Sequence, residues 1–283
     1  MSLLSTELCT RVNVRLSWCA VCGYLLWWAS ADLSAQIKIF TNIGADEGLC
    51  QSHVFCMVQD SQGYMWFGTY DGVSRWDGQQ FYNYRAQDGL ASSSVFCMEA
   101  APDGTIYFGT DKGVSAYRHG RFFFMPALDS LRKEMISALH AARDGSLYLA
   151  VLQKGLFVYR NGILEHIKPR DQEFSGRISA LHETRDGATS IATPAGPYPR
   201  QHGVIAPVPE LARGRFSDVW EGPDSTLYVG SVDGGLYILN RFGVRNITVA
   251  QGLSDNRVYA VRTGLDGRIL VTTFGGGVNI IHN

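Results

Sequence analysis

Residues Asp60 to Gly78 read DSQGYMWFGTYDGVSRWDG, in which short apolar stretches alternate with turn residues. The segment opens with a turn and continues through an apolar strand, Tyr64 to Gly68. A turn at Asp71-Gly72 leads into a second short strand, Val73 to Trp76, and a third turn follows at Asp77-Gly78. Asp-Gly pairs between apolar runs are typical of β-hairpins, because glycine accepts the positive φ angles of tight turns. The segment therefore predicts a hairpin.

The chain repeats this pattern. Six turn residues, Gly63, Gly104, Gly145, Gly187, Ser225 and Gly267, are spaced by 41, 41, 42, 38 and 42 positions. A fixed period of this length, built from short strands, predicts a propeller or a solenoid. We expect four strands in each unit, which in the first unit are His53–Gln59, Tyr64–Thr69, Val73–Trp76 and Gln80–Tyr84. Solenoid coils are shorter and lack this rhythm, so we favour an all-β β-propeller of about six four-stranded blades.

Alignment of the units on the turn residue produces columns of uniform character. The column four positions after the turn is apolar: Phe67, Phe108, Leu149, Ile191, Val229 and Val271. The next column is small: Gly68, Gly109, Ala150, Ala192, Gly230 and Thr272. Seven positions before the turn lie Cys56, Cys97, Ala138, Ala180, Asp218 and Ala260, and nine before lie Val54, Val95, Ile136, Ile178, Phe216 and Val258. Small residues on the strand before the turn are typical of a crowded innermost strand.

The units are expected near residues 48–88, 89–130, 131–172, 173–213, 214–251 and 252–283. Residues 36–47 resemble an orphan outer strand, because Phe40 and Asn42 align with Phe81 and Asn83. The sixth unit stops after its third strand, so exchange of an outer strand is expected to close the ring. The alternative is that the chain is cut from a longer propeller. Prolines in the fourth unit predict a third strand that is absent, bulged or at an edge.

The first 35 residues lie outside the repeat. A charged region is followed by an apolar run, Leu16 to Trp28, and by small residues that suit cleavage after Ala31 or Ala35. This order predicts a secretory signal peptide, residues 1–35, and export to the periplasm or the extracellular face; an uncleaved anchor is the alternative. Cys56 and Cys97 share a column and are interpreted as buried thiols rather than a disulfide. The net charge of −1 argues against a nucleic acid partner.

We find no catalytic motif, metal-ligand spacing or phosphate-binding loop, so no catalytic residue, metal or cofactor is expected. Glu99, His140, His182 and Arg262 share the column five positions before the turn, with Val58 and Trp220. Two histidines on successive inner strands suggest a shared ligand, but the column lacks further metal ligands. We therefore interpret the four polar residues as inner-strand side chains near the channel and as candidate ligand contacts.

Further candidate ligand contacts lie in the loops between the second and third strands. They are Tyr70, Asp71, Lys112, Lys154, Asp233 and Phe274. These loops vary in charge and aromaticity while the strands stay constant, which is the pattern of a recognition face on a rigid frame. Any set of exposed loops has the same pattern. Asp60, Asp103 and Asp144 are interpreted as turn residues rather than calcium ligands.

The pattern GLxxxxVxxMxxDxxGxMWFGTxxGVxRWDGxxFxxY, from Gly48 to Tyr84, resembles the two-component regulator propeller repeat. The resemblance extends over residues 37–283 and is poorest in the fourth unit. It implies the periplasmic sensor region of a bacterial histidine kinase or hybrid two-component system. In that family the propeller is usually followed by a small β domain, a membrane span and cytoplasmic signalling modules, and rings are often seven-bladed, so the six units depart from the pattern.

The expected function is ligand sensing by an exported, non-catalytic propeller of a two-component receptor. Expected partners are a small molecule or oligosaccharide, the receptor's own membrane-spanning kinase module or a separate kinase, and a second copy of the chain. The alternatives are an exported enzyme acting on glycans and a protein-binding scaffold. An enzyme needs paired carboxylates or a histidine and a tyrosine that converge on one face.

Overall fold

Tight turns set the strand boundaries in the computed structural model. At the first turn, the carboxylate of Asp60 accepts the backbone N–H groups of Gln62 and Tyr64, each at 2.9 Å, and Gly63 has a φ of 89°. Asp103 and Asp144 accept the N–H groups of Thr105 and Ser146 in the same way, each at 2.9 Å. The predicted role of these aspartates in turns is therefore confirmed.

The structure describes residues 43–167, 177–193, 214–264 and 266–281, together with 196–198, 200–201, 204–205, 208 and 211. The predicted signal peptide and residues 36–42 of the expected orphan strand lie outside this part. Within the rest of the expected 36–47 strand, Ala45–Glu47 forms a 3-10 turn (η1) instead, because the Glu47 side chain accepts the Gly44 N–H and favours a tight turn. In the described residues, no helix is long and apolar enough to span a bilayer.

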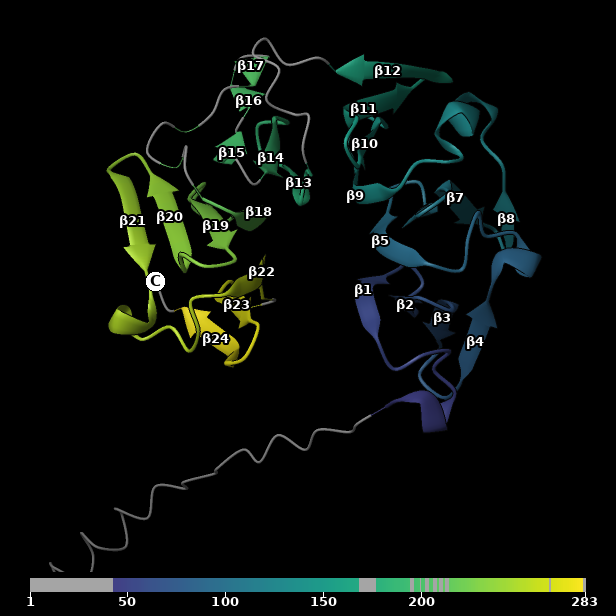
Figure 1. The fold of residues 1–283 in the computed structure, drawn as a ribbon, viewed down its shortest axis with the longest axis horizontal. Helices are drawn as coiled ribbons and strands as arrows, with labels where there is room; N and C mark the ends of the chain where they lie inside the picture. Colours follow the sequence, from purple (N-terminus) through teal and green to yellow (C-terminus); the bar gives the residue numbers. More distant parts are fainter. Residues whose placement is uncertain are drawn as a thin grey trace, which may run out of the picture. The chain divides into compact units, whose positions relative to one another are not determined.

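The strands form antiparallel sheets in which each strand pairs with the next along the chain (Figure 1). The first sheet contains β1 (Val54–Gln59), β2 (Met65–Thr69), β3 (Gly72–Trp76) and β4 (Phe81–Tyr84). The second contains β5 (Val95–Ala100), β6 (Ile106–Thr110), β7 (Gly113–Arg118) and β8 (Arg121–Phe123). The third contains β9 (Ile136–Ala141), β10 (Leu147–Val151), β11 (Gly155–Arg160) and β12 (Ile163–Ile167). Each predicted strand of the first unit starts within one residue of the observed one.

The remaining sheets are less uniform. The fourth unit has a three-stranded sheet, β13 (Ala180–Glu183), β14 (Thr189–Thr193) and β15 (Gly196–Tyr198), and a separate pair, β16 (Arg200–Gln201) and β17 (Val204–Ile205). The fifth has β18 (Phe216–Glu221), β19 (Leu227–Ser231), β20 (Leu236–Asn240) and β21 (Gly243–Ile247). The last has β22 (Val258–Thr263), β23 (Ile269–Thr273) and β24 (Gly277–Ile281). Further 3-10 turns are η2 (Ala86–Asp88), η3 (Pro126–Leu131) and η5 (Val249–Gln251).

The prolines of the fourth unit have the predicted effect. Its third strand, β15, is only three residues long and lies at the edge of its sheet. Pro197 is paired with Ala192, and an edge position tolerates a residue without an N–H group.

First strands of successive sheets lie side by side, in the order β1, β5, β9, β13, β18 and β22. Consecutive four-stranded meanders that pack through their first strands make a β-propeller and exclude a solenoid. Four of the described sheets have the expected four strands. The number of blades in the ring stays a prediction.

The apolar core lies between sheets. The cluster of Trp66 and Val73 with Val95 and Phe108 joins the first two sheets, and four further clusters fill the following interfaces. Cross-strand pairing brings the two small columns together, as in Cys56 with Gly68 and Ala138 with Ala150. The predicted core column is fully buried in five units, whereas Phe67 in the first is partly exposed.

Candidate functional site

A row of side chains crosses five consecutive sheets on their first strands. Its members are Glu99 on β5, His140 on β9, His182 on β13, Trp220 on β18 and Arg262 on β22, which all come from the column five positions before the turn. Because these first strands lie side by side, each member meets a neighbour from the adjacent sheet. The structure therefore brings Glu99, His140, His182 and Arg262 into one row, which the column alone did not establish.

His140 lies between carboxylates from the two flanking sheets. Its Nδ1 is 3.1 Å from Oε1 of Glu99, and the N–H of Ala141 donates to the same oxygen at 3.3 Å. Its Nε2 is buried, is 3.7 Å from Oε2 of Glu183, and has no hydrogen-bond partner among the described residues. This arrangement holds the imidazole tightly and hides the nitrogen that general acid–base chemistry would use.

Farther along the row, an imidazole, an indole and a guanidinium group lie against one another. The His182 and Trp220 rings have centroids 4.4 Å apart, and the guanidinium carbon of Arg262 lies 4.8 Å from the Trp220 ring on the next sheet. The indole N–H donates to the hydroxyl of Thr263 at 2.9 Å. The indole therefore contacts both an imidazole and a cation.

A buried carboxylate orients Arg262. Nη1 of Arg262 donates to Oδ2 of Asp218 at 2.5 Å, and the N–H groups of Val261 and Val219 donate to the Asp218 carboxylate at 2.8 and 3.0 Å. Burial raises the pKa of Asp218, and the charge of Arg262 opposes this effect. In the sequence, Asp218 is the acidic exception in a small column, and Arg262 lies two positions later in the repeat, in the next unit.

The surroundings of His182 disfavour its charged form. Burial, together with the nearby charges of His140, Arg262 and Arg143, lowers the pKa of His182 to about 4. Neither ring nitrogen of His182 has a hydrogen-bond partner in the described part of the chain. Near pH 7 the ring is therefore neutral and presents one N–H donor.

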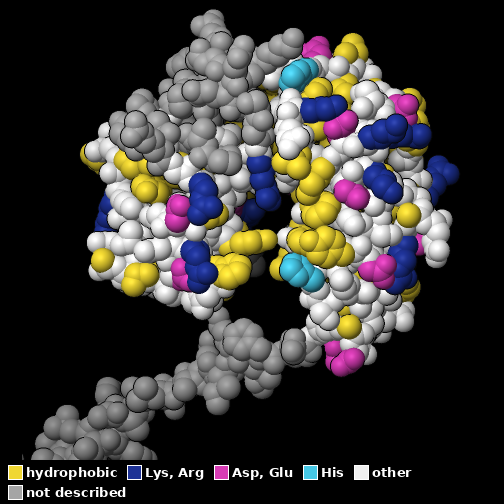
Figure 2. Space-filling model, viewed as in Figure 1, with side chains coloured by type: hydrophobic (Ala, Val, Ile, Leu, Met, Phe, Trp, Pro, Cys, Tyr) yellow, Lys and Arg dark blue, Asp and Glu magenta, His cyan; other side chains and the backbone are white. Residues whose placement is uncertain are grey.

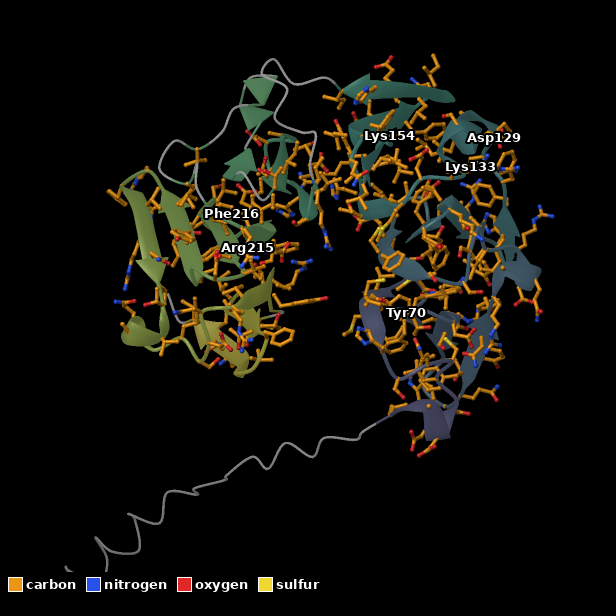
Figure 3. The ribbon with its side chains drawn as sticks, in the orientation of Figure 1. Tyr70, Asp129, Lys133, Lys154, Arg215 and Phe216 are labelled. Atoms are coloured by element: carbon orange, nitrogen blue, oxygen red, sulfur yellow. The ribbon has the colours of Figure 1, made fainter. Side chains whose placement is uncertain are left out.

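The six loop candidates are not brought together. Asp71 pairs with Arg85 at 2.9 Å, Lys154 with Glu134 at 2.8 Å, and Asp233 with Arg215 at 3.2 Å. Phe274 lies against Arg257, and the backbone N–H of Lys112 donates to Thr110 at 3.0 Å. Tyr70 and Lys154, labelled in Figure 3, lie in turns that connect strands of different sheets. Apart from the sequence neighbours Tyr70 and Asp71, the six residues come from separate turns, and the contacts above are made within each residue's own unit.

Tyr70 belongs to an aromatic cluster that the sequence did not reveal. Its ring meets Phe55 edge-on at 4.3 Å, and His53 and Phe96 lie within 6 Å of these rings. Phe55 and Phe96 occupy the β-bulges of β1 and β5, where the register of the pairing shifts. A bulge redirects a side chain, and the shared bulge position was the available signal.

In the described residues, no group of three or more His, Cys, Asp or Glu side chains has the geometry of a metal site. The free thiols are those of Cys50, Cys56 and Cys97. Burial raises the pKa of the Cys56 thiol to about 12 and that of Cys97 well above its ordinary value. The interpretation of Cys56 and Cys97 as thiols rather than a disulfide is confirmed, and both side chains are partly buried.

A model of the family described as "Two component regulator propeller" matches residues 48–71. Among solved structures, the extracellular domain described as that of a hybrid two component system, BT3049 from B. thetaiotaomicron, matches with a TM-score of 0.59 and 18% identity, over 86% of this chain and 41% of that chain. This chain therefore spans about two fifths of that relative's length.

Two further structures share the fold. Virginiamycin B lyase from Staphylococcus aureus matches with a TM-score of 0.59 and 12% identity, over 81% of this chain and 83% of that chain. The WD40 β-propeller domain of Doa1 matches with a TM-score of 0.61 and 15% identity, over 79% of this chain and 76% of that chain. No curated protein matches the sequence significantly. The chain is thus a β-propeller that carries a two-component regulator propeller repeat at residues 48–71.

Proposed function

We propose that residues 36–283 are the exported, ligand-sensing propeller of a two-component receptor, without catalytic activity in this region. The observation that carries the proposal is the family match on residues 48–71, within a fold shared with extracellular domains of hybrid two-component systems. The ring would consist of about six blades. Ligand binding would change its packing against a neighbouring domain or a second copy and so bias the output of a kinase, which is either fused to the receptor or a separate partner.

The row on the first strands supports sensing over catalysis. An enzyme acting on glycans is the second candidate, and the contact between Glu99 and His140 is the observation that favours it. However, the remaining nitrogen of His140 is buried and faces Glu183, so a substrate would have no access to it. A binding role needs no such access and uses the exposed guanidinium of Arg262 instead.

Export is tested by N-terminal sequencing of the protein recovered from the cell envelope. We expect the mature chain to begin at Asp32 or Gln36, since small residues precede both positions. A protein that retains Met1 to Ala31 would contradict cleavage and favour an anchor.

The sensing role is tested by joining the genomic open reading frame downstream of residue 283 to this chain and measuring kinase output. We expect that frame to encode a membrane span and a kinase, and small molecules or oligosaccharides that raise the melting temperature of the propeller to change phosphorylation. Mass spectrometry of those compounds should show them unchanged. Conversion into a product would favour the enzyme, and binding restricted to proteins would favour the scaffold.

A further inference from the structure

Each sheet packs against its neighbours through two opposite faces. The face toward the preceding sheet, called the back face, carries the columns nine and six positions before the turn residue and two and four positions after it. In the second sheet these residues are Val95, Met98, Ile106 and Phe108. They pack against Trp66 and Val73, which belong to the front face of the first sheet. All five apolar clusters of the described residues join a front face to the back face of the next sheet in this way.

The back face of the first sheet is exposed. Its Met57 is 64% exposed, whereas four residues of the same column are at most 9% exposed: Met98, Leu139, Val219 and Val261. The other members of this face, Val54, Met65 and Phe67, are partly exposed. In the described part of the chain, none of these four residues belongs to an apolar cluster between sheets.

The front face of the last sheet is exposed in the same manner. Val278 pairs with Thr272 and is 63% exposed, and Ile280 is 43% exposed. Val73 and Leu236, which occupy the position of Val278 in the first and fifth sheets, are fully buried. Figure 2 shows hydrophobic side chains at the surface of both the first and the last sheet. The two end sheets therefore do not bury each other's apolar faces.

The internal interfaces indicate what such faces bind. Each back face is buried by a front face and each front face by a back face, so a partner that buries both needs one of each. A single unit of the same repeat has both. A second copy of the chain fits less well, because a ring made of two chains would exceed the roughly four to eight blades that propellers have. Contact through one face alone would leave the other apolar face exposed.

We propose that the back face of the first sheet and the front face of the last sheet bind one further unit of the same repeat, which the same polypeptide supplies after residue 283. Every interface among the described sheets joins consecutive units of one chain, and this unit continues the series. The ring then has one blade more than the six units of this chain. The inference concerns assembly of the ring and does not depend on the sensing role.

The test is methionine oxidation of the natural gene product, recovered from the cell envelope, and of purified residues 36–283. Both are treated with hydrogen peroxide, and mass spectrometry of peptides gives the rate at each methionine. In the natural product we expect Met57 to be oxidised as slowly as Met98, because the further unit covers its column. In residues 36–283 we expect Met57 to react fast and Met98 slowly, since only Met98 is buried there. The slow reaction of Met98 also reports that the isolated chain is folded.

A matched pair of variants tests the other face. Val278→Asp in the natural product should lower its melting temperature, because it places a charge between two packed sheets. Ile163→Asp is the control, since Ile163 is 60% exposed on the outer strand β12 and should change the melting temperature little. Equal effects of the two substitutions would contradict coverage of the front face.

Fast oxidation of Met57 in the natural product, or a natural product that ends at residue 283, would overturn the proposal. Slow oxidation of Met57 in residues 36–283 would also overturn it. If that protection were the same at every protein concentration, the first and last sheets would cover each other; if it grew with concentration, a second copy would be the partner. The measurements use no kinase, so the sensing role is judged separately by kinase output.

Discussion

At the scale of single residues, the pair of Asp218 and Arg262 shows how a repeat accommodates an exception. Asp218 replaces the small residue found at the equivalent position of the other units, and its carboxylate is buried. A buried carboxylate is costly unless it is paired and hydrogen-bonded, and Arg262 with two backbone N–H groups meets that need. The pair therefore stabilises the fold, in addition to fixing Arg262 in the row.

Arg262→Gln should lower the free energy of unfolding by about 2–4 kcal/mol, because it leaves the Asp218 carboxylate buried without its cation. Urea denaturation measures the change. The deficit should shrink as the pH falls, since burial favours the neutral form of Asp218 and a protonated carboxyl no longer needs a cation. The added substitution Asp218→Asn should restore part of the loss.

Arg268→Gln serves as the comparison for this prediction. Arg268 pairs with Asp266 at the surface, where both side chains are more than 40% exposed. Its loss should change stability far less than the loss of Arg262, because solvent screens an exposed ion pair. If Arg262→Gln and Arg268→Gln changed the free energy of unfolding equally, the burial of Asp218 would not contribute to the cost of losing its cation.

The row was visible in the sequence only as a column. Spacing identified Glu99, His140, His182 and Arg262 as equivalent positions, because the turn residues fix the alignment within each unit. Their contacts depend on how one sheet packs against the next, which no local pattern encodes. The roles of Glu183 and Arg143 were missed for the same reason.

At the scale of elements, the small columns determine how closely a second strand approaches its neighbours. A Cβ atom added to Gly109 would lie 2.3 Å from Sγ of Cys97 and 2.9 Å from Cγ2 of Ile136 on the next sheet. The equivalent place in the third unit holds Ala138 opposite Ala150. In these two units, a Cys–Gly pair and an Ala–Ala pair therefore occupy equivalent space.

Gly109→Ala should destabilise the protein by about 1–3 kcal/mol through overpacking. The double variant Cys97→Ala with Gly109→Ala should recover most of this loss, because it recreates the alanine pair of the third unit, whose neighbour in the fourth, Ile178, is also an isoleucine. Thermal denaturation of the two variants and of Cys97→Ala alone measures the coupling. Additive losses would mean that Ile136, rather than Cys97, limits the space.

Strand positions were predictable because turn chemistry is local. Asp60 and Gly63 define the turn between the first two strands, and an Asp followed by Gly or Ser recurs at the equivalent turn of the other units, so the first-unit strands were placed within one residue. The bulges at Phe55 and Phe96 were not predicted, since a bulge depends on pairing register. The aromatic cluster around Tyr70 was therefore missed, although Tyr70 itself was named.

At the scale of the whole molecule, the apolar core consists of clusters that each lie between two neighbouring sheets. Every apolar cluster in the described residues contains side chains from two consecutive sheets. A sheet separated from its neighbours would expose both halves of its apolar surface, so it has no independent stability. Unfolding of one sheet should therefore destabilise the next, and the loss should spread along the chain.

Leu236→Ala tests this spread. Leu236 is fully buried between the fifth and last sheets, and its truncation should cost about 2–5 kcal/mol. We expect hydrogen exchange, followed by mass spectrometry, to show faster exchange in β9–β11 as well as in β18–β24, because the sheets open as one cooperative unit. Phe242→Ala is the matched control, since Phe242 is 83% exposed on the same sheet and its loss should change stability by less than about 0.5 kcal/mol. Acceleration confined to β18–β24 would instead mean that pairs of sheets open independently, and that a ligand bound in the row could order one part of the ring without the rest.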